Sequence, residues 1–487
     1  MTQVDHIEGV IGSFGRYQTW ILILISVGRL PTDYQLSNVV FILPSVDYVC
    51  KDDGAYNLTN HCPCKNPVYD TSTIVSSVTS TFNLICDRTQ LASLAQSFLQ
   101  VGILAGSIFY GYISDRYGRK FACLLALHSV VLFVAASAAV SELWMFIVAR
   151  FLMGTGVGGT MLCCYIMIIE LTGKSFRPYI TGLHEISFMV AYVSLPGLAF
   201  IFREWRYLQL VTSVPWLFVI AYSFILPESP RWLITVGRKD EAVTILTAIA
   251  KRNRRPSDNI RAIVDKVYEE TVRNNDQQYS TYLDIMRSPK LRVYALICAF
   301  VWLCCAHTFF GVNQYIGRLE GNIYLNVMLS GLILSPSVIL VIIATLYFRR
   351  KTSTIFTFCL TGVSLLCFIF IPSDYNVARL LVAFIGLTGS YTAFVLIYLY
   401  CSEVFPTVIR NSAMGFASVF ARFGGFIAPF VVNIGVEWAS LTIFSSLAFL
   451  AAVLCYFLPE TKGIVLLNSI EQREKSEKHI VKSDVIT

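Results

Sequence analysis

Charged residues are scarce in this sequence, because Asp, Glu, Lys and Arg together make up only 14% of its 487 residues. A soluble chain would carry about a quarter of such residues. Apolar residues supply 55% of the sequence, and the mean hydropathy is +0.62. These values exclude a soluble globular protein, and we expect the apolar surface to face lipid.

Residues for catalysis or cofactor binding are also missing. Only 6 histidines occur, no Cys/His set has zinc spacing, and no nucleophile stands in the context of a catalytic triad. Gly173-Lys174-Ser175 is similar to the end of a phosphate-binding loop, but Ile168 stands where its leading glycine would be. We therefore expect no enzyme, no metal and no cofactor, and any transport should run on gradients rather than ATP.

Neither a nucleic-acid surface nor a cleavable signal peptide is expected. The net charge is +7, but Lys and Arg collect in short loops and tails rather than in a binding stripe. The first apolar run follows Arg16 and is too long for the core of a signal peptide. We expect it to remain in the bilayer as the first span.

Apolar runs of about 20 residues, the length that crosses a bilayer, recur along the whole chain. The predicted spans are 19–43, 91–112, 121–140, 143–164, 178–202, 205–226, 291–315, 322–347, 352–371, 376–400, 411–433 and 438–458. Twelve spans place both tails on one side. That side carries 28 Lys and Arg residues against 6 on the other, so both tails are predicted to be cytoplasmic.

Two connections are long. Residues 44–90, on the outer side, contain the sequon at Asn57 and four cysteines, whose clustering predicts two disulfides of undetermined pairing: Cys50, Cys62, Cys64 and Cys86. The predicted parts are an N-tail at 1–18, a six-helix half at 19–226, a cytoplasmic connection at 227–290 with short surface helices, a second half at 291–458 and a C-tail at 459–487.

The two predicted halves share landmarks at a nearly constant offset of 229–233 residues. The matched pairs are Glu170-x6-Arg177 with Glu403-x6-Arg410, Pro227-Glu228 with Pro459-Glu460, Arg150 with Arg379, and Arg119-Lys120 with Arg350-Lys351. Such self-similarity predicts two parallel six-helix halves that rock about a central site, as in transporters.

The turn between spans 2 and 3, GYISDRYGRK (Gly111 to Lys120), predicts a gate. Glycines permit a tight turn there, and Asp115 is flanked by basic residues that can pair with carboxylates such as Glu170. Such a cluster latches in one state and breaks in the other. The gating residues are Asp115, Arg116, Arg119, Lys120, Glu170 and Arg177, with Glu403 and Arg410 in the second half.

Several strings together resemble the major facilitator superfamily, and more narrowly its organic cation, carnitine and organic anion transporter family. They include GRYQ (Gly15 to Gln18), FNLICD (Phe82 to Asp87), PESPRWL (Pro227 to Leu233), GNIYLNVMLSGL (Gly321 to Leu332) and EVFPTVIRNSAMGFASVFARFGGFIAPF (Glu403 to Phe430). The resemblance implies the all-α major facilitator fold and alternating-access transport of small organic ions across the plasma membrane. The second-half turn, Leu346 to Lys351, lacks the family's aspartate and glycines. A non-transporting membrane protein of the same fold is the alternative from another class.

Charged residues inside spans are costly unless they are paired or face water, so they are candidates for function. Arg29 and Asp33 are spaced i, i+4 and can neutralise one another. Glu185, beside His184, is either the partner of an arginine or a proton-sensitive group. Arg150 and Arg379 are either repeat-related anchors or functional residues.

The resemblance implies a role for aromatic residues of span 7 in a substrate cavity, namely Trp302, Phe309 and Phe310; Tyr398 of span 10 is a weaker candidate. It also implies that cation carriers have an aspartate where this chain has Arg422 and a glutamate where it has Leu334. The predicted substrate is therefore a zwitterion such as carnitine or an organic anion, bound by Arg422. Glu185 and Asp33 are further substrate-binding candidates, and either could instead neutralise Arg422. An organic cation is the alternative, and uniport, ion symport and exchange all stay open.

Overall fold

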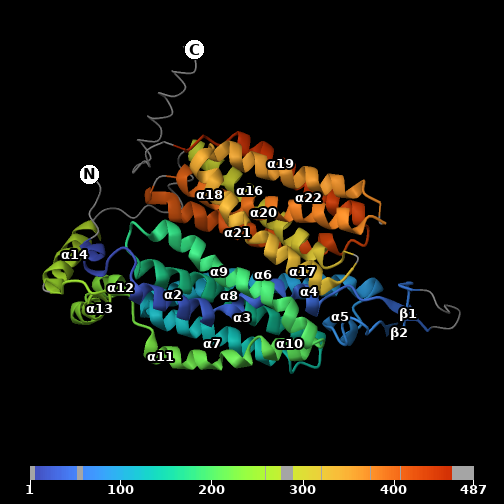
Figure 1. Ribbon diagram of the computed structural model, residues 1–487, viewed down its shortest axis with the longest axis horizontal. Helices are drawn as coiled ribbons and strands as arrows, with labels where there is room; N and C mark the ends of the chain where they lie inside the picture. The colour runs from blue at the N-terminus through green and yellow to red at the C-terminus, as the bar shows by residue number, and fades with distance from the viewer. Residues whose placement is uncertain are drawn as a thin grey trace, which may run out of the picture. The chain divides into compact units, whose positions relative to one another are not determined.

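The computed structural model describes residues 6–51, 59–257, 259–275, 289–319, 321–372, 374–405 and 407–462. The chain divides into two compact units, Met1–Gln277 and Gln278–Thr487. Figure 1 labels most of their helices and both strands.

Unit 1 consists of helices apart from one small sheet. Its elements are α1 (His6–Ile11), α2 (Arg16–Gly28), α3 (Leu30–Ser37), α4 (Val39–Ile42), β1 (Tyr48–Cys50), β2 (Pro67–Tyr69), α5 (Val78–Thr81), the 3₁₀ helix η1 (Cys86–Arg88), α6 (Thr89–Tyr117), α7 (Arg119–Ser137), α8 (Leu143–Glu170), α9 (Arg177–Ile201), α10 (Trp205–Val211), the 3₁₀ helix η2 (Val214–Ala221), α11 (Tyr222–Ile225), α12 (Pro230–Thr235), α13 (Lys239–Arg252) and α14 (Ile260–Asn275).

Unit 2 is helical throughout its described part. Its helices are α16 (Pro289–Ile316), α17 (Ile323–Leu334), α18 (Ser337–Tyr347), α19 (Arg350–Ile369), α20 (Asn376–Val404), α21 (Thr407–Val432) and α22 (Glu437–Tyr456).

Eleven helical segments of the described residues are long and apolar enough to cross a membrane. The predicted first span is not among them, and it is divided into α2, α3 and α4. Pro31 lies in the first turn of α3 and has no N–H for the helical bond to Val27. The carbonyl of Val27 instead accepts a hydrogen bond from the Trp216 indole at 2.7 Å. This interruption places Arg29 and Asp33 side by side in the interior of unit 1.

Close helix packing in unit 1 depends on glycines. The helices α6 and α8 pack most extensively, and a Cβ at Gly102, Gly106, Gly154 or Gly158 would collide with the backbone of the facing helix. Small residues spaced four apart permit such an approach within a bilayer. The α6–α8 pair is therefore a rigid base for the turn that follows α6.

In unit 2, α16 packs mainly against α21, while α19 packs against α20 and α22. Gly424 of α21 lies against the backbone of Leu303 in α16, again with no room for a Cβ. The predicted eighth span divides at Pro336 into α17 and α18. These contacts hold Arg422 and the aromatic residues of α16 and α20 within one packed unit.

The long outer connection forms a short antiparallel pair, in which Tyr48 of β1 lies opposite Tyr69 of β2. Two disulfides join Cys50 to Cys64 and Cys62 to Cys86, which gives the pairing that the sequence leaves open. The predicted glycosylation site, Asn57, lies outside the described residues.

The connection after α11 folds against the start of the chain. Helices α12, α13 and α14 pack on one another, and α1 packs on α13 and α14 (Figure 1). Asn253, after α13, donates to the carbonyl of Ile11 at 2.9 Å and accepts from the backbone N–H of Tyr17 at 3.0 Å. The described part of the connection, up to residue 275, is therefore packed as part of unit 1.

Candidate functional site

The predicted gate cluster of unit 1 is assembled around Arg119. Its Nη1 donates to Asp115 Oδ1 at 2.6 Å, and its Nε donates to Glu170 Oε1 at 3.1 Å. The side chain of Arg119 is 15% exposed, whereas that of Asp115 is 76% exposed. The pair with Glu170, itself 18% exposed, is therefore the better shielded of the two and the stronger electrostatic contact.

A second carboxylate, absent from the predicted gate, completes this cluster. Glu228 accepts a hydrogen bond from the backbone N–H of Lys120 at 3.0 Å, at the start of α7. The turn residue Gly118 has φ +109°, and a Cβ there would collide with the Glu228 carboxylate. Glycine is thus required both for the backbone conformation and for this close approach. A carboxylate at a helix N-terminus also satisfies free N–H groups and the helix dipole.

The other predicted gating residues of unit 1 lie around this cluster with different contacts. Arg116 is exposed and donates to the Tyr112 hydroxyl at 2.7 Å. Arg231 donates to the carbonyl of Glu170 at 3.0 Å, and the Trp232 indole donates to the carbonyl of Asp115 at 3.0 Å. Arg177, at the start of α9, is half-buried. The PESPRWL segment therefore anchors the gate turn from the connection side.

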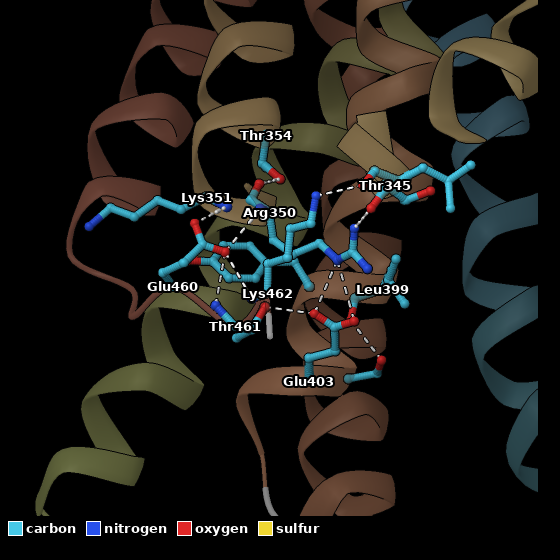
Figure 2. Close-up of polar contacts among 12 residues, drawn as sticks. Thr345, Arg350, Lys351, Thr354, Leu399, Glu403, Glu460, Thr461 and Lys462 are labelled. Atoms are coloured by element: carbon cyan, nitrogen blue, oxygen red, sulfur yellow. Dashed lines mark hydrogen bonds and ion pairs between the residues drawn. The ribbon is translucent and has the colours of Figure 1, made fainter. Parts of the chain in front are cut away.

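The same arrangement recurs in unit 2 around Arg350 (Figure 2). Arg350 Nε donates to Glu403 Oε2 at 3.3 Å. Glu460 accepts from the backbone N–H groups of Arg350 at 2.9 Å and Lys351 at 3.3 Å. Figure 2 also shows Glu403 directed at Thr461, whose hydroxyl donates to it at 2.6 Å. Arg350, Glu403 and Glu460 thus take the places of Arg119, Glu170 and Glu228.

Arg410, predicted as a gating residue, bonds directly to no carboxylate among the residues that the structure describes. Its Nη2 lies 3.5 Å from the carbonyl of Phe405. Burial lowers the pKa of the Arg410 guanidinium from its usual value, while the nearby Glu403 carboxylate acts in the opposite direction. Glu403 is therefore shared electrostatically between Arg350 and Arg410.

Arg29 and Asp33, in the divided first span, form a buried ion pair. Arg29 Nη2 donates to Asp33 Oδ1 at 2.7 Å, and both side chains are at most 2% exposed. The second oxygen, Asp33 Oδ2, accepts from the Ser187 hydroxyl of α9 at 2.6 Å. This geometry supports the interpretation that Arg29 and Asp33 neutralise one another. Both carboxylate oxygens of Asp33 already accept hydrogen bonds, so neither is left for a substrate.

The repeat-related arginines Arg150 and Arg379 are bound differently. Arg150 is fully buried and donates to the side-chain oxygen of Gln96 in α6. Arg379 pairs with Glu437 of α22 and lies over the ring of Phe368, 4.5 Å from its centroid. Only Arg379 has a carboxylate partner among the described residues, so the two do not play equivalent electrostatic parts.

Arg422 of α21 is half-buried and makes no ion pair or hydrogen bond with any described residue. No carboxylate is among its electrostatic neighbours there either. A guanidinium at this depth of a span needs a counter-charge or water. Arg422 is therefore a positively charged group available to a ligand.

The predicted aromatic residues come together on α16 and α20. Trp302 lies 5.5 Å from the ring of Tyr398, and Phe309 lies 5.4 Å from that of Phe310. Phe394 joins the two pairs, with its ring 6.5 Å from that of Trp302 and 5.9 Å from that of Phe309. Tyr398 is 48% exposed whereas Trp302 is 6% exposed. The cluster thus has a packed side and an open side.

Three residues of these clusters were missed from sequence. The sequence identifies Glu228 and Glu460 only as landmarks of the repeat. Their matched positions after spans 6 and 12 could have indicated that they belong to the two gate clusters. Phe394 gave no signal, since one phenylalanine more in an apolar span is unremarkable in a chain with 34 of them. Among the described residues no group of His, Cys, Asp and Glu could hold a metal ion.

Known proteins share this chain's sequence and fold. The family profile described as "Sugar (and other) transporter" matches residues 53–471. The inward-open xylose transporter XylE from E. coli superposes with a TM-score of 0.70 at 18% identity, covering 92% of this chain and 98% of that one. The fold is thus that of a major facilitator transporter, and the described residues hold twelve spans once the divided first span is counted. The family match over most of the sequence makes the chain a transporter rather than an enzyme.

Curated relatives define the narrower family. The organic cation transporter protein of Drosophila melanogaster is 29% identical over 520 residues, covering 97% of this chain and 95% of the relative. Human solute carrier family 22 member 13 is 33% identical over 400 residues, covering 82% and 72%. The chain belongs to the solute carrier 22 family of the major facilitator superfamily, a family of multi-pass membrane transporters of organic ions.

Proposed function

We propose that this transporter moves small organic ions that carry a carboxylate, either a zwitterion such as carnitine or a monovalent anion, by alternating access. The observation that supports the proposal is the unpaired Arg422 guanidinium, which lacks any carboxylate neighbour among the described residues. A bare cation would meet this charge without compensation, whereas a carboxylate would form a charge-assisted hydrogen bond with it.

The aromatic cluster supports an organic substrate rather than an inorganic one. Tyr398 and Phe310 lie next to the buried Trp302 and Phe309 in the same unit as Arg422. An aromatic surface binds the apolar part of a small organic ion and a quaternary ammonium group equally well. It therefore fits carnitine, which combines such a group with a carboxylate.

An organic cation is the second candidate, since two relatives from Drosophila melanogaster bear that name, and one of them matches 97% of this chain. The aromatic cluster alone would serve it. The two candidates differ in whether Arg422 attracts the substrate or repels it.

The test is uptake into oocytes of tetraethylammonium, L-carnitine, hippurate and succinate side by side, with and without sodium. We expect uptake of L-carnitine or hippurate, its loss in Arg422→Asp and its retention in Arg422→Lys, which keeps the charge. Strong uptake of tetraethylammonium alone, unchanged or raised in Arg422→Asp, would establish the cation candidate. Normal surface expression with no uptake of any probe would favour a protein that keeps the fold without transporting.

A further inference from the structure

One half-buried carboxylate of unit 1, that of Glu185, differs from the charged groups around it in having no bonded partner among the described residues. Glu185 of α9 lies within electrostatic range of Arg29 and Asp33. It nevertheless makes no hydrogen bond or ion pair with any described residue. A carboxylate within a span costs several kcal/mol when it is charged and unpaired. Glu185 must therefore either hold a proton or meet water.

The nearby arginine cannot serve as its partner, because it is already engaged. Both Nε and Nη2 of Arg29 donate to Asp33 Oδ1, at 3.2 and 2.7 Å. The remaining nitrogen, Nη1, is directed at His184. The Arg29–Asp33 pair is therefore neutral as a unit, and no nitrogen of Arg29 is left to bond to Glu185.

His184 cannot take the proton instead. Its Nε2 faces Arg29 Nη1, which is a donor in all circumstances, so Nε2 must accept and stay unprotonated. A protonated ring would place two donors and two positive charges against each other. His184 is thereby kept neutral, with its ring 5.5 Å from that of Tyr165.

Other titratable groups come from the helices packed against α9. Helix α8 contributes the thiol of Cys164, within electrostatic range of Arg29, and the phenol of Tyr165, whose ring lies beside that of His184. Asp33 of α3 is fixed by Arg29 and Ser187. Helix α10 also packs against α9. It begins at Trp205, however, after the C-terminal end of α9 at Ile201 and well beyond Glu185 in the sequence. Glu185 is thus the group here that can change charge.

We propose that Glu185 is a proton-binding site that couples proton movement to transport, with the proton and a carboxylate substrate moving in the same direction. Glu185 is half-buried, so water and protons reach it in the state that opens toward it. In the closed state the protonated form is favoured, because no partner remains to stabilise the charge. A proton bound in one state and released in the other biases the conformational equilibrium. This inference rests on the proposed transport of organic ions.

The experiment uses the full-length protein in liposomes, with labelled hippurate as the probe and the membrane potential clamped. An inward proton gradient should raise wild-type uptake about fivefold or more, the range of ordinary coupling free energies. Glu185→Gln, which mimics the protonated carboxyl, should lose that stimulation. It should still exchange external for internal hippurate at a rate near that of the wild type, because exchange requires no proton release.

Controls separate this inference from the proposed function. Glu142→Gln removes an exposed acid at the start of α8 and should keep the full response to the gradient. Wild-type exchange without any response to the gradient would overturn the proton site while leaving transport intact. Retained stimulation in Glu185→Gln would do the same. Absence of exchange for hippurate, carnitine and tetraethylammonium alike would instead contradict the proposed function. A raised KM in exchange mode would identify Glu185 as a substrate contact and so reject the proton site.

Discussion

Arg350 donates to both carboxylate oxygens of Glu403, at 3.4 and 3.3 Å, and so reproduces in unit 2 the contact of Arg119 with Glu170. Figure 2 shows the pair at the start of α19. The repeat is therefore chemical as well as architectural, since in each unit an arginine at a helix start faces a glutamate from the end of another helix. What differs is the aspartate: Asp115 contacts Arg119, whereas Arg350 turns its Nη1 to the backbone carbonyl of Thr345.

The first prediction concerns the gate of unit 1. Replacing both Asp115 and Arg119, as Asp115→Asn with Arg119→Ala, removes the ion pair and the two bonds to Glu170. The predicted latch should bias an equilibrium rather than hold the fold, so transport should fall several-fold while surface expression stays largely intact. Initial uptake rates and surface biotinylation measure the two effects. Lys174→Ala, which removes an exposed basic residue, is the control and should leave uptake unchanged. Unchanged uptake in the double variant as well would show that the cluster only anchors the turn and does not gate transport.

The second prediction concerns the cap of α19. Glu460 accepts from the first two backbone N–H groups of that helix, and Glu460→Gln removes its charge. Capping and dipole interactions of this kind contribute about 1 kcal/mol, so the thermal midpoint of the solubilised protein should fall by roughly 2–4 °C. Asp374→Asn, at an exposed acid before α20, should leave it unchanged. An equal shift in the two variants would mean that Glu460 has no special part in the cap.

Much of the fold could be predicted from sequence, since apolar runs and the 229–233 residue offset follow directly from the residues. The divided first span could not, although Pro31 carried a signal, because hydropathy averages over a proline that interrupts one turn. The pairing of Arg29 with Asp33 followed from their spacing. The sequence could not predict that Glu185 and Arg422 lack bonding partners among the described residues, because this depends on which side chains of other helices pack near them.

Orientation gives the third prediction, since the charge bias predicts that both tails are cytoplasmic. An epitope inserted next to Asn57 should be reachable on intact cells, and glycosidase should increase the gel mobility. An epitope between Pro256 and Ser257 should require permeabilisation. The structure favours that position because both residues are exposed, while Asn253 holds the N-terminal segment through its side chain. Labelling of the second epitope on intact cells would reverse the topology.

The last prediction separates the open side of the aromatic cluster from its packed side. Tyr398 is 48% exposed with its ring 5.5 Å from that of Trp302. Trp302 is 6% exposed, and its indole donates to Cys401 Sγ at 3.2 Å. Truncating a buried tryptophan costs about 3–5 kcal/mol of stability, so Trp302→Ala should lower the amount of folded protein at the surface.

Tyr398→Ala should instead leave surface expression near that of the wild type. It removes an aromatic contact of about 0.5–1.5 kcal/mol, so the KM for hippurate should rise about two- to tenfold, with little change in the maximal rate per surface molecule. Phe370→Ala is the matched control, because that ring is 82% exposed at the end of α19 and should leave the KM unchanged. If Tyr398→Ala and Phe370→Ala behave alike, the ring of Tyr398 faces lipid and the cavity must lie against other residues. A fall in expression without a change in KM would place Tyr398 with the packing residues, beside Trp302.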